Sequence, residues 1–289
     1  KKQINNIRIW GDNYMKLKRN ERIGAIVKIL SEHPNKTFTL SHFTEKFNTA
    51  KSTLSEDIML VKGVFEKLHL GKVITIPGAS GGVRYIPFLS KDDSMEFLEG
   101  ISKKIEDKER MLPGGFLYLI DVIYDPDIVA TIGKIFASII DYSKVDYLVT
   151  IETKGIPMAL MTAKAMNIPL LIIRKNSKIS EGSSLGITYV SGTSGAVQSM
   201  SLPRRNIKEG SKVILIDDFM RGGGTIKGMY DLMKEFRAEV VATGVLISTV
   251  KPKEKMIDNY ISLLEIEEGN GENIVRPSMS FLEKISENL

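Results

Sequence analysis

The chain has 289 residues, no cysteine and a net charge of +5, with 43% hydrophobic and 26% charged residues. This length and composition suit two globular domains. The lack of cysteine excludes disulfides, thiol catalysis and cysteine-ligated metals, and it agrees with the cytoplasmic location that we expect. No apolar run of about eighteen residues and no secretory signal is visible, so we expect no membrane partner.

Basic residues are concentrated near the N-terminus. Residues 15–90 contain twelve Lys and Arg against six Asp and Glu, whereas residues 91–289 contain 25 against 28. A basic small domain joined to a mildly acidic larger one indicates a polyanionic partner for the first, although such an excess can also serve solubility alone. Residues 1–14 show no periodicity and are expected to be a tag or a disordered tail.

Residues 15–90 are typical of a winged helix-turn-helix. Apolar residues at helical spacing predict a first helix that ends at Pro34 and a second helix capped by Ser41. A third helix is expected after Asn48, and its first turn offers a cation and hydroxyl groups to a major groove.

A β-hairpin is predicted after these helices. Residues 73–76 and 83–86 have the composition of strands, and the glycine-rich turn between them would form the wing. This arrangement predicts binding to double-stranded DNA, with a protein-interaction module as the alternative that the basic excess disfavours. The residues expected to contact DNA are Lys16, Lys18, Arg19, Arg22, Lys51, Ser52, Thr53, Ser55 and Arg84.

The rest of the chain alternates strands and helices. Residues 91–111 are interpreted as a linker helix and residues 112–289 as an α/β domain. Strands are predicted at 147–151, 170–173, 213–216 and 240–248, and helices at 129–140, 156–166 and 225–236. Alternation of buried, β-branched strands with helices predicts a parallel sheet covered by helices, in which ligands bind beyond the carboxyl ends of the strands.

Residues 213–225 carry the most specific signal. Four branched apolar residues lead to Asp217 and Asp218, and a glycine run and a helical pattern follow. Such a loop turns backbone N–H groups onto an anion, and the helix N-terminus adds its positive dipole end. The two acids suit ribose hydroxyls or a magnesium ion that arrives with a ligand. No lysine follows the second glycine, so the loop is not a P-loop.

This pattern resembles the phosphoribosyl pyrophosphate loop of the type I phosphoribosyltransferases, where the acids bind the ribose and the loop binds the 5′-phosphate. The loop residues expected to contact the ligand are Asp217, Asp218, Phe219, Met220, Arg221, Gly222, Gly223, Gly224 and Thr225. A second anion site is expected at a strand-to-helix junction that consists of Thr153, Lys154 and Gly155. In those enzymes the corresponding loop holds pyrophosphate.

Other pocket residues are predicted from their positions. Arg174 and Lys175 form a cationic pair at a strand end, and Phe116 and Tyr118 are candidates for stacking on a base or, equally, for the core. The glycine-rich and hydroxyl-rich segment between Lys175 and Leu202 is predicted to be a mobile flap. The three histidines lack metal spacing, so no metal site from protein side chains alone is expected.

Six motifs in one order resemble the purine repressor family of Gram-positive bacteria, which joins a winged helix to a phosphoribosyltransferase-like domain. They are AKSTLSED from Ala50, PGASGGV from Pro77, LPGGF from Leu112, TKGIP from Thr153, EGSS from Glu181 and DDFMRGGGT from Asp217. The resemblance implies a homodimeric, non-catalytic repressor of purine genes that requires no cofactor. It also implies phosphoribosyl pyrophosphate as inducer and guanosine tetra- or pentaphosphate as competing co-repressor, with Phe116 and Phe219 on either side of the guanine.

Two alternatives remain at this point. An active purine phosphoribosyltransferase with a regulatory winged helix would use the same pocket for positioning and electrostatic stabilisation. An RNA-binding attenuator with transferase activity is disfavoured, because the basic excess lies in a separate domain with a major-groove helix. The operator and the sign of regulation, repression or activation, stay open.

Overall fold

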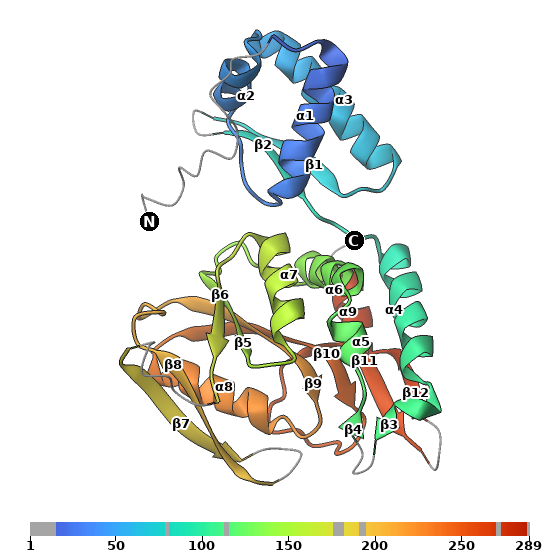
Figure 1. Ribbon diagram of the computed structural model, residues 1–289, viewed down its shortest axis with the longest axis vertical. Coiled ribbons are helices and arrows are strands. Elements are labelled where there is room, and N and C mark those ends of the chain that lie inside the picture. Colours follow the sequence, from blue (N-terminus) through green and yellow to red (C-terminus); the bar gives the residue numbers. More distant parts are fainter. Residues whose placement is uncertain are drawn as a thin grey trace. The chain divides into compact units, whose positions relative to one another are not determined.

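A computed structural model describes residues 16–78, 81–112, 116–175, 182–190, 195–269 and 273–287. The chain divides into two compact units, Lys1–Pro87 and Phe88–Leu289, and each unit has hydrophobic core residues of its own (Figure 1). The division therefore falls slightly before the boundary expected at residue 90.

The N-terminal unit is a winged helix. Its elements are α1 (Arg19–Glu32), α2 (Leu40–Phe47), α3 (Lys51–Lys67), β1 (Lys72–Ile76) and β2 (Gly82–Ile86). The helices bury Leu30, Phe43 and Leu54 completely, and the hairpin adds Val83. The cap of α2 is Thr39, whose Oγ1 accepts a hydrogen bond from His42 N at 3.2 Å, so the prediction of Ser41 as cap is wrong.

The turn between β1 and β2 depends on glycine. A β carbon at Gly81 would lie 2.1 Å from the carbonyl oxygen of Ile76, and Gly78 adopts a φ of +107°. Both conditions exclude larger residues, which explains why the wing turn is rich in glycine.

A six-stranded sheet forms the centre of the C-terminal unit, with the strand order β12-β11-β10-β9-β5-β6. The strands are β5 (Tyr147–Ile151), β6 (Leu170–Ile173), β9 (Lys212–Met220), β10 (Glu239–Thr249), β11 (Ile261–Glu268) and β12 (Asn273–Pro277). All neighbouring pairs are parallel except β11 with β12. The prediction of a parallel sheet is confirmed, and an antiparallel edge strand is added to it.

Helices cover both faces of this sheet (Figure 1). They are α4 (Lys91–Ile105), α5 (Ile120–Ile123), α6 (Pro126–Ile139), α7 (Ile156–Met166), α8 (Gly224–Glu235) and α9 (Met279–Glu287). Along β9, Ile214 and Ile216 join the cluster formed with α4, α6, α7 and α9, whereas Val213 and Leu215 join the cluster formed with α8. This alternation follows from the side-chain period of a strand.

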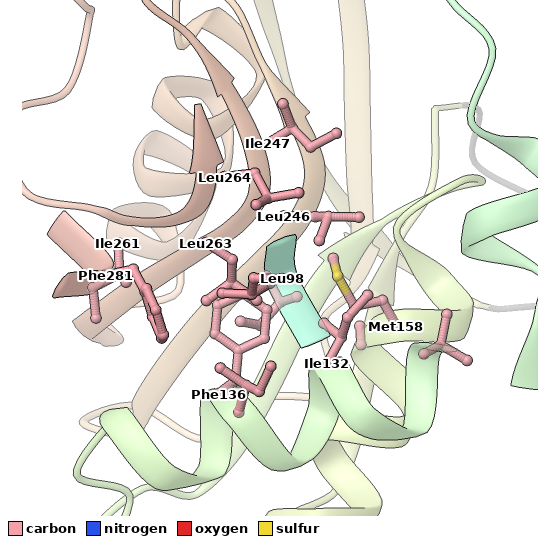
Figure 2. Close-up of a cluster of buried hydrophobic side chains, with 14 of the residues drawn as sticks. Leu98, Ile132, Phe136, Met158, Leu246, Ile247, Ile261, Leu263, Leu264 and Phe281 are labelled. Carbon is pink, nitrogen blue, oxygen red and sulfur yellow. The ribbon is translucent and has the colours of Figure 1, made fainter. Parts of the chain in front are cut away.

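Helix α4 is part of the core and not a linker. Leu98, Ile101 and Ile105 are buried in the same cluster as the sheet, and Figure 2 shows Leu98 beside Phe136 of α6. The helix also ends in a tertiary contact, since Glu106 Oε1 accepts a hydrogen bond from Val275 N of β12 at 2.9 Å. Residues 91–111 therefore belong structurally to the second unit.

Two short ribbons complete the unit. They are β3 (Met111–Leu112) with β4 (Phe116–Leu117), and β7 (Ser184–Val190) with β8 (Val197–Pro203). The second ribbon occupies much of the segment that we expected to be a mobile flap, whose residues 176–181 and 191–194 lie outside the described residues. Within the described parts of the chain, no helix is long and apolar enough to cross a membrane.

Candidate functional site

The carboxyl end of β9 carries two acids, of which Asp217 is buried and Asp218 is half-buried. The strand continues to Met220, so Asp217 and Asp218 belong to it instead of following it. Asp217 is only 5% exposed, and its Oδ1 accepts a hydrogen bond from Asp218 N at 3.0 Å. Burial raises the pKa of Asp217 well above its usual range, and the neighbouring charge of Asp218 raises it further.

The pKa of Asp218 is also raised by burial, but two cations act against this effect. A hydrogen bond with Asp217 lowers the pKa of Asp218, and the positive charges of Lys154 and Lys175 lower it further. A buried carboxylate pair is unfavourable unless a cation or hydroxyl donors satisfy it. The pair is therefore suited to a ligand that carries vicinal hydroxyls or a divalent cation.

A glycine turn follows the acids and begins α8. Gly223 has a φ of +84° and is the N-cap of the helix, and its carbonyl oxygen accepts a hydrogen bond from Lys227 N at 2.8 Å. The first N–H groups and the positive dipole end of α8 thus follow the acid pair after a short turn, an arrangement that suits an anion site. The Arg221 guanidinium pairs with Glu268 of β11, with Nη2 2.5 Å from Oε1. Because the side chain is engaged there, the backbone of Arg221 is the part of this residue that would contact a ligand.

The predicted pyrophosphate loop lies against the acids. Residues 152–155 connect β5 to α7, with Thr153 and Lys154 exposed and Gly155 buried as the N-cap. A β carbon on Gly155 would lie 2.7 Å from Thr150 Oγ1 and 3.0 Å from Asp217 Oδ1. Glycine is needed here because the predicted pyrophosphate loop packs against the ends of β5 and β9. The structure thus brings Gly155 next to Asp217, two residues that were predicted separately.

Glu152 organises the end of β6 and was missed by sequence reasoning. Its carboxylate accepts hydrogen bonds from Arg174 Nη1 at 3.1 Å and from Lys175 N at 2.6 Å. The charge of Arg174 is thus already paired, whereas Lys175 lines a cavity of about 610 Å³ together with residues of β7 and β8. The sequence signal that could have identified Glu152 is its position directly before the predicted Thr–Lys–Gly loop.

Tyr189 of β7 is a second residue that the sequence did not indicate. It is buried, and its hydroxyl donates a hydrogen bond to Gln198 Oε1 at 2.7 Å. Burial raises its pKa, a hydrogen bond with Thr225 lowers it, and the charge of Asp217 raises it. The β7–β8 ribbon therefore reaches the phosphate loop, which a flap prediction did not anticipate.

The aromatic candidates differ in environment. Tyr118 is 41% exposed, and the Arg110 guanidinium lies 6.0 Å from its ring centroid, so this ring is not part of the core. Phe219 is partly buried against the core cluster. The backbone of Phe116 belongs to β4, but its side chain lies outside what the structure describes.

The first turn of α3 carries the predicted DNA-contacting groups on its outer side. Lys51, Ser52 and Ser55 are exposed and Thr53 is half-buried, whereas Leu54 packs in the core. The Ser55 hydroxyl donates a hydrogen bond to Lys51 O at 2.9 Å, which leaves its lone pairs outward. The arrangement meets the geometric requirement of a major-groove helix.

Arg22 is not available to DNA, so its assignment as a phosphate contact is wrong. The residue is 8% exposed, its Nε donates to Asp57 Oδ2 at 2.7 Å, and its Nη1 donates to Leu17 O at 3.0 Å. Its role is to tie α1 and the preceding basic segment to α3. An Arg placed 35 positions before its acidic partner gives no sequence signal of this pairing.

The other basic candidates are placed differently. Lys16 and Lys18 are exposed. Arg19 lies on the surface beside the same acid, with Nε 3.4 Å from Asp57 Oδ1. Arg84 is half-buried in β2, opposite Ile74, and not at the tip of the wing.

A winged helix joined to an α/β unit with this strand-end site defines a class of protein, a transcription regulator that carries a domain of phosphoribosyltransferase fold. Residues 18–87 match the family described as "Bacterial purine repressor, N-terminal", and residues 120–281 match the "Phosphoribosyl transferase domain". The chain is 42% identical to "Purine biosynthesis transcriptional repressor PurR" of Bacillus subtilis, over 87% of this chain and 88% of that protein. The chain belongs to the bacterial purine repressor family, as the motifs indicated.

Other relatives locate the two parts of this similarity. "Purine biosynthesis transcriptional activator PurR" of Lactococcus lactis is 38% identical over 87% of this chain and 93% of its own length. Adenine phosphoribosyltransferase from Thermoanaerobacter pseudethanolicus shares the fold with a TM-score of 0.50 at 20% identity, over 57% of this chain and 98% of that one. The regulators thus match both units, whereas the transferase matches little more than half of the chain.

Proposed function

We propose that this protein is a repressor of genes for purine biosynthesis and transport, and that it binds operator DNA as a homodimer in the cytoplasm. Phosphoribosyl pyrophosphate, with Mg²⁺, would act as inducer, and guanosine tetra- or pentaphosphate would compete as co-repressor. One observation carries the proposal: the buried Asp217 and the half-buried Asp218 precede a glycine-rich helix start and lie near the loop of Lys154 and Gly155, in the same chain as an exposed, basic first turn of α3.

The effector follows from the chemistry of that pocket. Asp217 and Asp218 would accept hydrogen bonds from the ribose hydroxyls or coordinate Mg²⁺, while the N-terminus of α8 would bind the 5′-phosphate. Lys154 and the backbone at Gly155 would bind the pyrophosphate. Differential affinity for two conformations of the dimer would couple this site to DNA binding.

The decisive experiment combines operator binding with a transfer assay. Binding is measured on fragments from upstream of purine genes and on scrambled DNA, with and without phosphoribosyl pyrophosphate and Mg²⁺. We expect preference for the upstream fragments and release by the ligand. Rapid transfer to a purine base without any DNA binding would refute the proposal and favour the second candidate.

That second candidate is an active purine phosphoribosyltransferase. It is supported by the match to xanthine phosphoribosyltransferase of Lactococcus lactis, which is 34% identical over 49% of this chain. The acid pair and the two predicted anion loops are the groups that such a reaction would use. The winged helix, which the transferase does not need, favours regulation.

Lys51→Ala should weaken binding to all DNA sequences, because Lys51 is exposed at the start of α3 and would neutralise a phosphate. The slope of log K against log salt concentration should fall by about one. Lys67→Ala removes an exposed cation at the other end of the same helix and serves as the control. Unchanged affinity and salt slope for Lys51→Ala would mean that α3 does not read DNA in this orientation.

A further inference from the structure

The segment that follows β10 lies against the outer side of the anion-binding loop. We call residues 250–257 the strap. Lys255 of the strap donates hydrogen bonds through Nζ to Arg221 O at 2.5 Å, to Thr249 O at 2.7 Å and to Thr249 Oγ1 at 3.2 Å. One ammonium group therefore joins the end of β10 to Arg221, the first residue of the loop after β9.

A second contact fixes the next peptide of the loop. Met256 N donates a hydrogen bond to Gly222 O at 2.9 Å. The loop also approaches the strap closely at Gly223, where a β carbon would lie 3.4 Å from Met256 N. The strap thus binds two consecutive loop carbonyls, those of Arg221 and Gly222.

The orientation of these carbonyls determines the orientation of the neighbouring N–H groups. In a trans peptide the C=O and N–H bonds point in opposite directions. When Lys255 holds Arg221 O, the N–H of Gly222 is directed away from the strap, and the Met256 contact does the same for the N–H of Gly223. These two donors are thereby turned to the other side of the loop, where an anion would bind.

A run of three glycines does not hold such a shape alone, because glycine has wide conformational freedom and loses much entropy when it is ordered. We infer that Lys255 is a positioning residue that holds the glycine loop in its anion-binding shape before the ligand arrives. The inference rests on the proposed function, since it concerns the loop that would bind the 5′-phosphate of phosphoribosyl pyrophosphate.

The surroundings of Lys255 agree with a fixed ammonium group. The side chain is half-buried. Burial lowers its pKa, and the charge of Arg221 lowers it further, while Glu268 acts in the opposite direction. A partly desolvated cation is held here by oxygen acceptors of the backbone, which a methionine of similar length cannot replace.

The test uses the full chain with Lys255→Met, Lys255→Arg and the control Lys253→Met, which changes an exposed lysine of the same strap. Hydrogen–deuterium exchange without ligand reports the shape of the loop, and calorimetric titration with phosphoribosyl pyrophosphate and Mg²⁺ reports its use. For Lys255→Met we expect faster exchange confined to residues 221–225 and affinity lower by about ten-fold or more. Lys255→Arg should recover part of both effects, and Lys253→Met should match the wild type.

The outcomes separate this inference from the proposed function. If the wild type does not bind phosphoribosyl pyrophosphate, the proposed function fails, but exchange in the loop still decides whether Lys255 holds its shape. If Lys255→Met binds as tightly as the wild type, or if its loop exchanges at the wild-type rate, the positioning role is refuted. A fall in melting temperature with uniform faster exchange would show a general structural role and would also refute it.

Discussion

Asp217→Asn should stabilise the unliganded protein at neutral pH while it abolishes the response to phosphoribosyl pyrophosphate. Asp217 is 5% exposed, and burial raises its pKa well above the usual range. Ionising such a group inside the protein is unfavourable, and asparagine removes that charge while it retains an oxygen that can accept the Asp218 N–H. We expect a gain of about 1–3 kcal/mol in the free energy of unfolding.

The pH dependence gives this prediction its sign. Because the pKa of Asp217 is higher in the folded than in the unfolded state, the folded state binds the proton more tightly. This contribution to stability is present below the unfolded pKa and is lost as pH rises through the folded pKa. The advantage of Asp217→Asn over the wild type should therefore grow as pH rises through that window, which urea unfolding at several pH values measures.

Ligand binding should change in the opposite direction. An amide neither coordinates Mg²⁺ with full charge nor accepts two ribose hydroxyls as a carboxylate does, so calorimetric titration should show no binding at ligand concentrations that saturate the wild type. Asp258→Asn changes an exposed aspartate and should alter neither property. A variant that lost stability at every pH would contradict the view that the carboxyl group is kept for a ligand at the expense of stability.

The central sheet could be predicted from the sequence because several of its strands are short apolar runs with clear boundaries. The ranges 147–151 and 170–173 were predicted with the observed ends, since short β-branched runs are bounded by polar or turn-forming residues. The strand at 213–216 was predicted too short, because the two acids looked like a loop. They are strand residues because β9 pairs with β10 as far as Met220, and this pairing overrides their own preference for a loop.

The β7–β8 ribbon could not be predicted for the opposite reason. Glycine, serine and threonine dominate the segment between Lys175 and Leu202 as a whole, and this local composition indicated a loop. The ribbon packs on α8, where a β carbon on Gly228 would lie 2.7 Å from Met200 Cε. Such contacts between distant segments leave no periodic signal in either segment.

Among site residues, local motifs located the loops but not the side chains that organise them. Asp217, Lys154 and Gly155 were found because each belongs to a strand-to-helix junction with a recognisable chemistry. Glu152 and Lys255 act through contacts to backbone atoms of other elements, and those contacts depend on the tertiary fold. Position in a motif therefore indicates candidate ligand contacts, but it does not reveal the residues that hold the candidate site together.

Asp57→Ala should unfold the winged helix and abolish DNA binding while the C-terminal unit still binds phosphoribosyl pyrophosphate. Asp57 is fully buried, and it pairs with Arg22 at 2.7 Å and with Arg19 at 3.4 Å. Its removal leaves the buried guanidinium of Arg22 without a counter-charge, which costs about 3–5 kcal/mol. That is comparable to the whole stability of a domain of this size, so circular dichroism should show loss of helix and operator binding should disappear.

The double variant Arg22→Met with Asp57→Leu separates charge from packing. Replacing both members of a buried pair with apolar side chains is often neutral, so the helices should refold and thermal unfolding should return close to the wild type. DNA affinity should recover only in part, because Arg22 also holds Leu17 O and thereby the exposed Lys16 and Lys18. If Asp57→Ala alone bound operator like the wild type, the ion pair would be dispensable and the basic segment would owe its position to other contacts. Full recovery of DNA affinity in the double variant would instead show that the attraction between Arg22 and Asp57 only offsets the cost of burying their charges. The pair would then not orient the basic segment with Lys16 and Lys18 for DNA.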